Sequence, residues 1–443
     1  MTGMSVGPYR EITFDKDGDS PGGPTGQAAG LAELARQGCT DLLVFAHGWN
    51  NTPAVATRFY SAFFAPFPGL QGPGVRLGYA GVVWPSMMFS DEPVPDFASL
   101  AATVPGKTAV VARLAELTGT EPARESAFAE FAALLRELTD TDRPGSLGPD
   151  ADVPAFLVAD PLTTYAAFAA ADGSERSDGS EGSEGSEGSE GSEESEESEE
   201  SEGSEESEGS YGEGGEGGSD GEALFGGDRV KRLWKGAKEA LRQATYYTMK
   251  RRAGVVGARG LGPVLGELAR TAPGLRVHLA GHSFGGRLVA HALLGLPDGT
   301  RTVKSVTLLQ GAFSHYAFAA RLPHAPGRGG SLPDLQRRVD GPLVACHSRH
   351  DTALRVFYPL ASRLSRDDDA LLGQDGRRWG AVGYDGIQAV PGASARTLGA
   401  VLRDGLPGSG CVSVDAAEVV SEHSDVCHPE LAGVVARAGR FGG

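Results

Sequence analysis

The sequence predicts an α/β protein with a mostly parallel sheet and helices on both faces of that sheet. Strand-type and helix-type segments alternate along the second half of the chain, which is the order that produces parallel strands joined by crossover helices. The strand-type segments are continuous apolar runs instead of alternating ones, as expected when both faces of a sheet are covered. The apolar content of 40% is sufficient for a sizeable core.

The N-terminal part of the chain supplies three predicted strands and one predicted helix. The strands are "YREITFD" at 9–15, "DLLVFAHGWN" at 41–50, which ends in a glycine turn, and "VRLGYAGVVWP" at 75–85, which ends at a proline. The segment "FYSAFFAPF" at 59–67 lies between the last two strands and predicts a helix.

The C-terminal part repeats the alternation of strand and helix four times. A long helical pattern from about Arg232 and a second one at 262–274 precede it. The expected strands cover residues 275–283, 302–311, 341–348 and 410–420, and the expected helices cover residues 286–296, 332–339, 352–364 and 428–438.

These patterns divide the chain into a core in two parts and a long intervening stretch. Residues 1–86 and 228–443 form the predicted α/β core. Residues 87–170 predict a helical insertion and a candidate lid, because "TAVVARLAEL" and "ESAFAEFAALLREL" show helical spacing. Residues 171–227 hold 21 Asp and Glu and one Arg among many Ser and Gly, so we expect a disordered acidic linker without secondary structure.

The acidic linker accounts for the net charge of the chain. The whole chain carries −18 and residues 171–227 carry −20, which leaves +2 for the remainder. The predicted core is therefore close to neutral, and we expect no nucleic-acid partner. We interpret the linker as a solvated spacer, and recruitment of a basic protein partner is the alternative.

Cysteine usage and the absence of an apolar segment predict the compartment. The four cysteines show no CxxC pairing, the N-terminal residues show no signal region, and no run of about 18 apolar residues occurs. We therefore expect no membrane span and a cytoplasmic location. The histidines and cysteines show no metal-ligand spacing, so no metal site is expected either.

One serine lies where a strand passes into a helix. The stretch "GHSFGG" places Ser283 between Gly281 and Gly285, directly after His282 and a buried-type strand. Glycines two residues before and after a serine allow a sharp turn that exposes its hydroxyl at the carboxyl edge of a sheet. The pattern alone is weak in a glycine-rich chain, but the strand before it and the helix after it strengthen it. Ser283 is therefore predicted to be a nucleophile.

A serine nucleophile needs a base, and the base needs a group that orients it. Chain order places the base after the last strand, where both His423 and His428 occur; we favour His423, because His428 begins the last helix. The orienting acid is expected just past the preceding strand of the core, where Asp351 lies in "HSRHDTAL". Asp351 could alternatively be a helix N-cap, and Asp415 and Asp425 are then the fallbacks.

The developing oxyanion needs backbone N–H donors. The residue after the nucleophile, Phe284, supplies one of them. The second is expected from the turn "HGWN", where His47 and Gly48 form the turn, the amide of Trp49 is the donor and Asn50 supports it.

The motifs "HGWN", "GHSFGG", "HSRHD" and "EHSD", in this order and at these strand ends, resemble the α/β-hydrolase superfamily of serine hydrolases, and its lipase- and esterase-like members in particular. The resemblance covers the two core parts. It implies an eight-stranded type of sheet and a triad of Ser283, His423 and Asp351. The chain departs from the family's pattern in showing one strand before "DLLVFAHG", where the family usually has two, and in carrying its insertion before the nucleophile strand.

The motifs together predict a serine hydrolase that cleaves an ester, thioester or amide of a small or acyl substrate through an acyl-enzyme on Ser283, without a cofactor. Esterase or lipase activity is favoured over peptidase activity, and the peptidase stays an alternative because it uses the same triad. A non-catalytic interaction module on the same fold is the second alternative.

Overall fold

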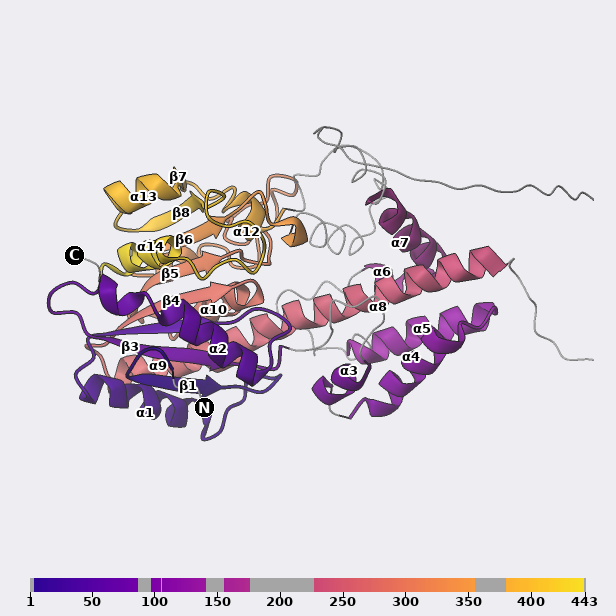
Figure 1. Ribbon diagram of the computed structural model, residues 1–443, viewed down its shortest axis with the longest axis horizontal. Coiled ribbons are helices and arrows are strands. Elements are labelled where there is room, and N and C mark those ends of the chain that lie inside the picture. The colour runs from indigo at the N-terminus through magenta and orange to yellow at the C-terminus, as the bar shows by residue number, and fades with distance from the viewer. Residues whose placement is uncertain are drawn as a thin grey trace, which may run out of the picture.

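A computed structural model describes residues 4–86, 97–104, 106–140, 155–175, 227–354 and 380–441 of the chain. Within these residues, eight strands form one sheet in which every neighbouring pair is parallel (Figure 1). The strands are β1 (Tyr9–Thr13), β2 (Asp41–Ala46), β3 (Leu77–Val83), β4 (Arg276–His282), β5 (Val303–Leu309), β6 (Pro342–His347), β7 (Ser394–Thr397) and β8 (Gly410–Asp415). The α/β class and the parallel sheet expected from the sequence are thus confirmed.

The order of the strands creates a switch point in the middle of the sheet. The order is β1-β3-β2-β4-β5-β6-β8-β7, so the chain leaves β2 on one side to form β3 and continues on the other side with β4. In open parallel sheets, the crevice at such a point lies at the carboxyl ends of the strands and is where ligands bind. A ligand-binding site is therefore expected at the carboxyl ends of β2 and β4.

Alternate residues of β2 enter two separate cores, one on each face of the sheet. Leu42 and Val44 belong to the first core and Leu43 and Phe45 to the second, and all four are fully buried. Burying one such side chain contributes roughly 1.5–3 kcal/mol. Helices α1 (Gly23–Arg36), α9 (Gly262–Thr271) and α10 (Phe284–Gly295) cover the first core, and α2 (Pro53–Phe64), α13 (Leu398–Asp404) and α14 (Pro429–Gly439) cover the second.

A second group of helices lies beside the sheet and is called the helical body here. It consists of α3 (Phe97–Thr103), α4 (Thr108–Thr120), α5 (Glu125–Leu138), α6 (Ala155–Val158), α7 (Pro161–Glu175) and the first part of α8 (Gly227–Val255). Trp234 of α8 is fully buried there, with its ring 4.8 Å from Phe128 and 5.5 Å from Phe131. Gly236 is required two residues further on, because a Cβ at this position would collide with the backbone carbonyl of Tyr165.

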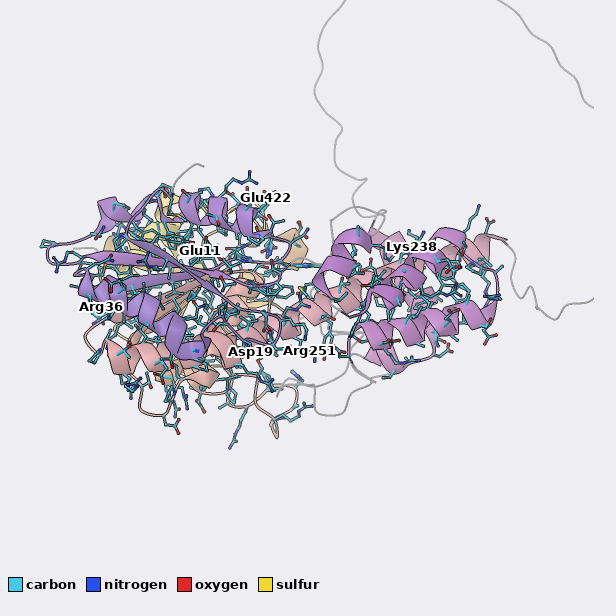
Figure 2. The ribbon with its side chains drawn as sticks, turned by 90° about the horizontal axis from the view of Figure 1, so that it is seen from below. Glu11, Asp19, Arg36, Lys238, Arg251 and Glu422 are labelled. Atoms are coloured by element: carbon cyan, nitrogen blue, oxygen red, sulfur yellow. The ribbon has the colours of Figure 1, made fainter. Side chains whose placement is uncertain are left out.

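Helix α8 connects the helical body to the sheet. Figure 2 shows Lys238 within the helical body and Arg251 where the same helix reaches the sheet. There the Nε of Arg287 of α10 donates to the Lys250 carbonyl at 2.7 Å, and Arg252 donates to the carbonyl of Pro85 at 2.8 Å. The chain continues through the π-helix η2 (Val256–Leu261) into α9. The two hydrogen bonds fix α8 against α10, the helix that follows β4, and against the segment that follows β3.

Three expectations from the sequence differ from the structure. The predicted strand 410–420 ends at Asp415, because its side chain accepts the amide of Ala417 at 3.0 Å and residues 416–420 form a turn. The predicted helix 332–339 is only the 3₁₀ turn η3 (Leu335–Arg338), since Asp334 before it has a φ of 61°. The predicted linker at 171–227 begins inside α7, which reaches Glu175.

Several elements were not expected from the sequence. Helix α1 lies between β1 and β2 in the chain. The short helix α12 (Val382–Asp385) comes just after residue 380, where the described part of the chain resumes, and β7 and α13 follow it before β8. The rest of the predicted linker, residues 176–226, lies outside the described residues, as does most of the predicted helix 352–364, of which residues 352–354 are helical.

A buried Ser–His–Asp group lies near the amino ends of the central strands. His278 of β4 contacts Asp41 of β2 at 2.8 Å and Ser305 of β5 at 3.0 Å, and all three side chains are at most 1% exposed. The ring of Phe441 packs against His278 with 5.0 Å between centroids. Since no substrate can reach these atoms, we interpret the group as a structural network that joins three strands.

No helix in the described part of the chain has the length and apolar character to cross a membrane. Even α8, with 29 residues, carries charged side chains along its length.

Candidate active site

The four predicted site segments meet at one edge of the sheet. Ser283 follows β4, Asp351 lies shortly after β6, His423 lies after β8, and residues 47–50 follow β2. Because all these strands are parallel, their carboxyl ends lie at the same edge. The structure therefore brings together segments that are separated by up to several hundred residues in the chain.

Ser283 adopts a strained backbone conformation. Its φ is 56° and its ψ is −121°, a region of backbone conformation that residues other than glycine rarely adopt. Hydrogen bonds hold it there: its amide donates to the carbonyl of Leu309 at 3.0 Å, and its carbonyl accepts the amides of Gly286 at 3.0 Å and Ala312 at 3.2 Å. Strain of this kind persists only where the surroundings fix it, as they do here.

Three glycines around Ser283 are required by close packing. A Cβ on Gly281 would collide with the backbone of Gly285, and a Cβ on Gly285 would collide with the carbonyls of Ala46 and His47. A Cβ on Gly48 would lie 2.9 Å from the Cβ of Ser283. The predicted roles of Gly281, Gly285 and Gly48 in the turn therefore have a steric cause.

His423 lies between Ser283 and Asp351. Its Nε2 is 2.9 Å from the Oγ of Ser283, and its Nδ1 is 2.7 Å from the Oδ2 of Asp351. With the proton on Nδ1, the ring donates to the carboxylate and leaves Nε2 as the acceptor of the serine O–H. Both distances are within the reach that proton transfer between a nucleophile and its base requires.

Asp351 has both of the roles that the sequence left open. Its Oδ1 accepts the amide of Leu354 at 2.9 Å, as an N-cap does, while its Oδ2 faces His423. The residue is fully buried, and hydrogen bonds to both of its oxygens compensate for the lost hydration of the carboxyl group. Ser348 connects this loop to the loop after β8, which contains His423, because its hydroxyl donates to the carbonyl of Val420 at 2.8 Å.

The alternative residues for the triad have other partners. The Nε2 of His428 contacts the Oδ1 of Asp425 at 2.6 Å, and Asp425 also accepts the amide and hydroxyl of Ser421. Asp415 accepts the amide of Ala417. Of the two histidines and three acids considered, the structure brings His423 and Asp351 to Ser283.

His282 fixes the position of the loop that contains His423. Its Nε2 donates to the backbone carbonyl of His423 at 2.8 Å, and its ring packs between Phe59 and His423. Burial and the neighbouring His423 lower the pKa of His282 to about 3, so the ring stays neutral near pH 7. The residue before Ser283 thereby orients His423, the predicted base.

The turn after β2 is held rigidly beside Ser283. The ring of His47 stacks on Trp84 at 5.6 Å, and its Nδ1 donates to the Gly48 carbonyl at 2.8 Å; burial lowers its pKa to about 4. Asn50 has a φ of 62°, and its amide donates to the Ser86 carbonyl at 3.0 Å. These contacts keep the backbone between His47 and Asn50 in one conformation.

Two backbone amides lack an acceptor at this site. Among the described residues, neither the amide of Trp49 nor that of Phe284 has a hydrogen-bond partner. Phe284 begins α10, where N–H groups have no partner within the helix and the helix dipole is positive. The two predicted donors are therefore available to an anionic oxygen.

A cavity of about 390 Å³ opens beside Ser283 and His423. Its wall includes residues that the sequence did not indicate, namely Arg242, Gln243 and Tyr246 of α8. Their spacing places them on one face of that helix, which is a recognisable signal, but nothing in the pattern tells which surface they face. Two larger hollows, of about 660 and 650 Å³, lie at the amino ends of β4 and β5 and beside β7, away from Ser283.

Within the described residues, no group of three or more His, Cys, Asp and Glu side chains is arranged to hold a metal ion. Comparisons of the chain with protein-family models, with curated proteins and with solved structures found no match.

The glycine at position 285 provides a test of the turn. We expect Gly285→Ala to destabilise the protein by about 1–3 kcal/mol or more, because its Cβ overlaps the carbonyls of Ala46 and His47 at the end of β2. Gly30→Ala in α1 is the matched control, since no atom lies within 4 Å of its added Cβ and alanine favours helix. Urea unfolding measures both; equal stability of the two variants would contradict the packing described here.

The buried histidines predict acid sensitivity. His282 and His47 have folded pKa values of about 3 and about 4, below the usual 6.5, so the unfolded state binds more protons below that pH. The contribution of these neutral rings to the free energy of unfolding is therefore complete above pH 6.5. It decreases as the pH drops, by about 2 kcal/mol for each histidine at pH 5. Urea unfolding at pH 7 and pH 5 should show this loss and a smaller one in His282→Gln. A free energy of unfolding that is equal at both pH values would refute it.

Proposed function

We propose that the chain is a serine hydrolase of the α/β-hydrolase type that cleaves a small ester through an acyl-enzyme on Ser283. The observation that carries the proposal is the position of His423, which is in hydrogen-bond contact with both Ser283 and Asp351. The strained turn at Ser283 and its place at the carboxyl edge of a parallel sheet add support, because a nucleophile elbow has both features.

In the first half of the reaction, the Oγ of Ser283 attacks the ester carbonyl carbon while the Nε2 of His423 takes the hydroxyl proton. The resulting oxyanion accepts hydrogen bonds from the amides of Trp49 and Phe284. The bond to the leaving alcohol then breaks, and His423 returns its proton to the alcohol oxygen. The acyl group stays on Ser283 as an ester.

In the second half, water attacks the acyl group and His423 takes its proton. The bond to the Ser283 Oγ breaks, the serine regains its proton, and the carboxylic acid leaves. Asp351 keeps the base in the tautomer that can accept at Nε2 and stabilises the imidazolium ion when it forms. This route needs no cofactor.

The cavity favours a small ester over a polypeptide as the substrate. Its volume of about 390 Å³ is near the lower end for small-molecule sites, and the rings of Trp49, Tyr246 and Phe284 pack on one another in its wall. On this proposal the helical body is an insertion in the α/β-hydrolase fold that contributes one wall of the cavity through α8.

Hydrolysis of short-chain p-nitrophenyl esters tests the proposal. We expect Ser283→Ala to lower kcat by about 10⁶-fold, the usual effect of removing a triad nucleophile. Asp351→Asn should lower kcat by about 10⁴-fold, because an amide stabilises the wrong tautomer of the base. Circular dichroism confirms that each variant is folded. Hydrolysis by Ser283→Ala at the rate of the unchanged protein would rule the mechanism out.

A further inference from the structure

Three polar side chains form a connected group on the face of α8 that meets the cavity. The carboxylate of Glu239 accepts from the Nε2 of Gln243 at 2.7 Å and pairs with the guanidinium of Arg242 at 2.8 Å. Gln243 and Arg242 both line the cavity that contains Ser283, and the Glu239 side chain is only 13% exposed. Glu239 therefore holds both neighbours in place without lining the cavity itself.

The contact with Glu239 decides the orientation of the Gln243 amide. A carboxylate only accepts hydrogen bonds, so the NH₂ group of Gln243 must face Glu239 and the carbonyl Oε1 must face away from it. Gln243 is 2% exposed, and its Oε1 has no hydrogen-bond partner within the described part of the chain. A buried acceptor without a partner is costly and rare in proteins.

Trp49 and Asn50, in the wall of the same cavity, also carry polar atoms that have no partner among the described residues. They are the indole Nε1 of Trp49, which donates, and the side-chain Oδ1 of Asn50, which accepts. The residues of the cavity wall thus include two unpaired acceptors and one unpaired donor, all three buried, beside aromatic rings. An alkyl chain would leave all of these groups unsatisfied, whereas a hydroxyl group can donate and accept at once.

Charge disfavours an ionic group at this position. The Glu239 carboxylate already compensates the charge of Arg242, so a substrate carboxylate would add a second negative charge there. An ammonium group would lie close to the Arg242 guanidinium. A neutral donor is the group that fits the unpaired Gln243 carbonyl without leaving a buried charge uncompensated.

We propose that the substrate is an ester with a hydroxyl group near the scissile bond, and that Gln243 is the residue that selects it. Glu239 acts as a positioning residue through its contact with the Gln243 amide. This inference rests on the proposed function, since it names the substrate class of the same site.

Three esters with the same acyl length separate the cases. Ethyl butyrate has no donor, ethyl 3-hydroxybutyrate has one in its acyl group, and glycerol monobutyrate has two in its alcohol. We expect kcat/KM to be at least about tenfold higher for one of the hydroxylated esters, because a site with an unpaired acceptor discriminates against the analogue that lacks the donor. The preferred ester shows which side of the scissile bond faces Gln243.

Variants connect the preference to Gln243. Gln243→Met keeps the length of the side chain without its carbonyl. It should reduce the ratio of kcat/KM for the preferred hydroxylated ester to kcat/KM for ethyl butyrate to within about threefold of unity. In Glu239→Gln, the amide of Gln243 can rotate by 180°, because the new side chain can donate as well as accept. This variant should therefore reduce the same ratio partially. Gln37→Met, at the exposed end of α1, is the matched control and should keep the ratio.

The outcomes separate this inference from the proposed function. Hydrolysis that depends on Ser283 but shows no preference for either hydroxylated ester overturns the inference and leaves the proposed function intact. A preference that persists in Gln243→Met also overturns it. If none of the esters is hydrolysed in a manner that depends on Ser283, both proposals fail.

Discussion

The contacts of one imidazole ring unite the carboxyl edge of this sheet. His423 touches the hydroxyl after β4 and the carboxylate after β6 while it belongs to the loop after β8, so three strands must end at the same level for the arrangement to exist. The surrounding bonds serve this requirement: His282 holds the carbonyl of His423, and Ser348 holds that of Val420. Each bond joins two of the loops, which makes the geometry of the site a property of the whole sheet edge.

The long helix α8 connects this edge with the helical body. Its first turns pack in the helical body through Trp234, its middle lines the cavity with Gln243, and its end is fixed to α10 through the bond between Arg287 and Lys250. Since α10 begins directly after Ser283, α8 and α10 together hold the cavity wall and Ser283 in fixed relative positions. Through α8, the helical body is thus connected directly to the wall of the cavity.

How far the sequence predicts this structure depends on how local each signal is. Ser283 could be identified because its glycines and the flanking strand and helix are adjacent in the chain, and Asp351 and His423 followed from chain order. The preference for His423 over His428 came from the position of His428 at the start of the last helix, whereas the bond of His428 to Asp425 carries no signal in the sequence. Helix α1 was missed because its glycines obscure the pattern, although Leu31 and Leu34 are fully buried. The polar edge strand β7 and the cavity residues of α8 carry no local signal of their place.

The most direct test of the account is covalent labelling with a fluorophosphonate, followed by peptide mass mapping of the labelled site. A serine that is activated by His423 should react stoichiometrically, and the label should be found on Ser283. His423→Ala should abolish the reaction although the serine itself is unchanged. Absence of the label from Ser283, or equal labelling of Ser283→Ala, would contradict the claim that this site is a working triad.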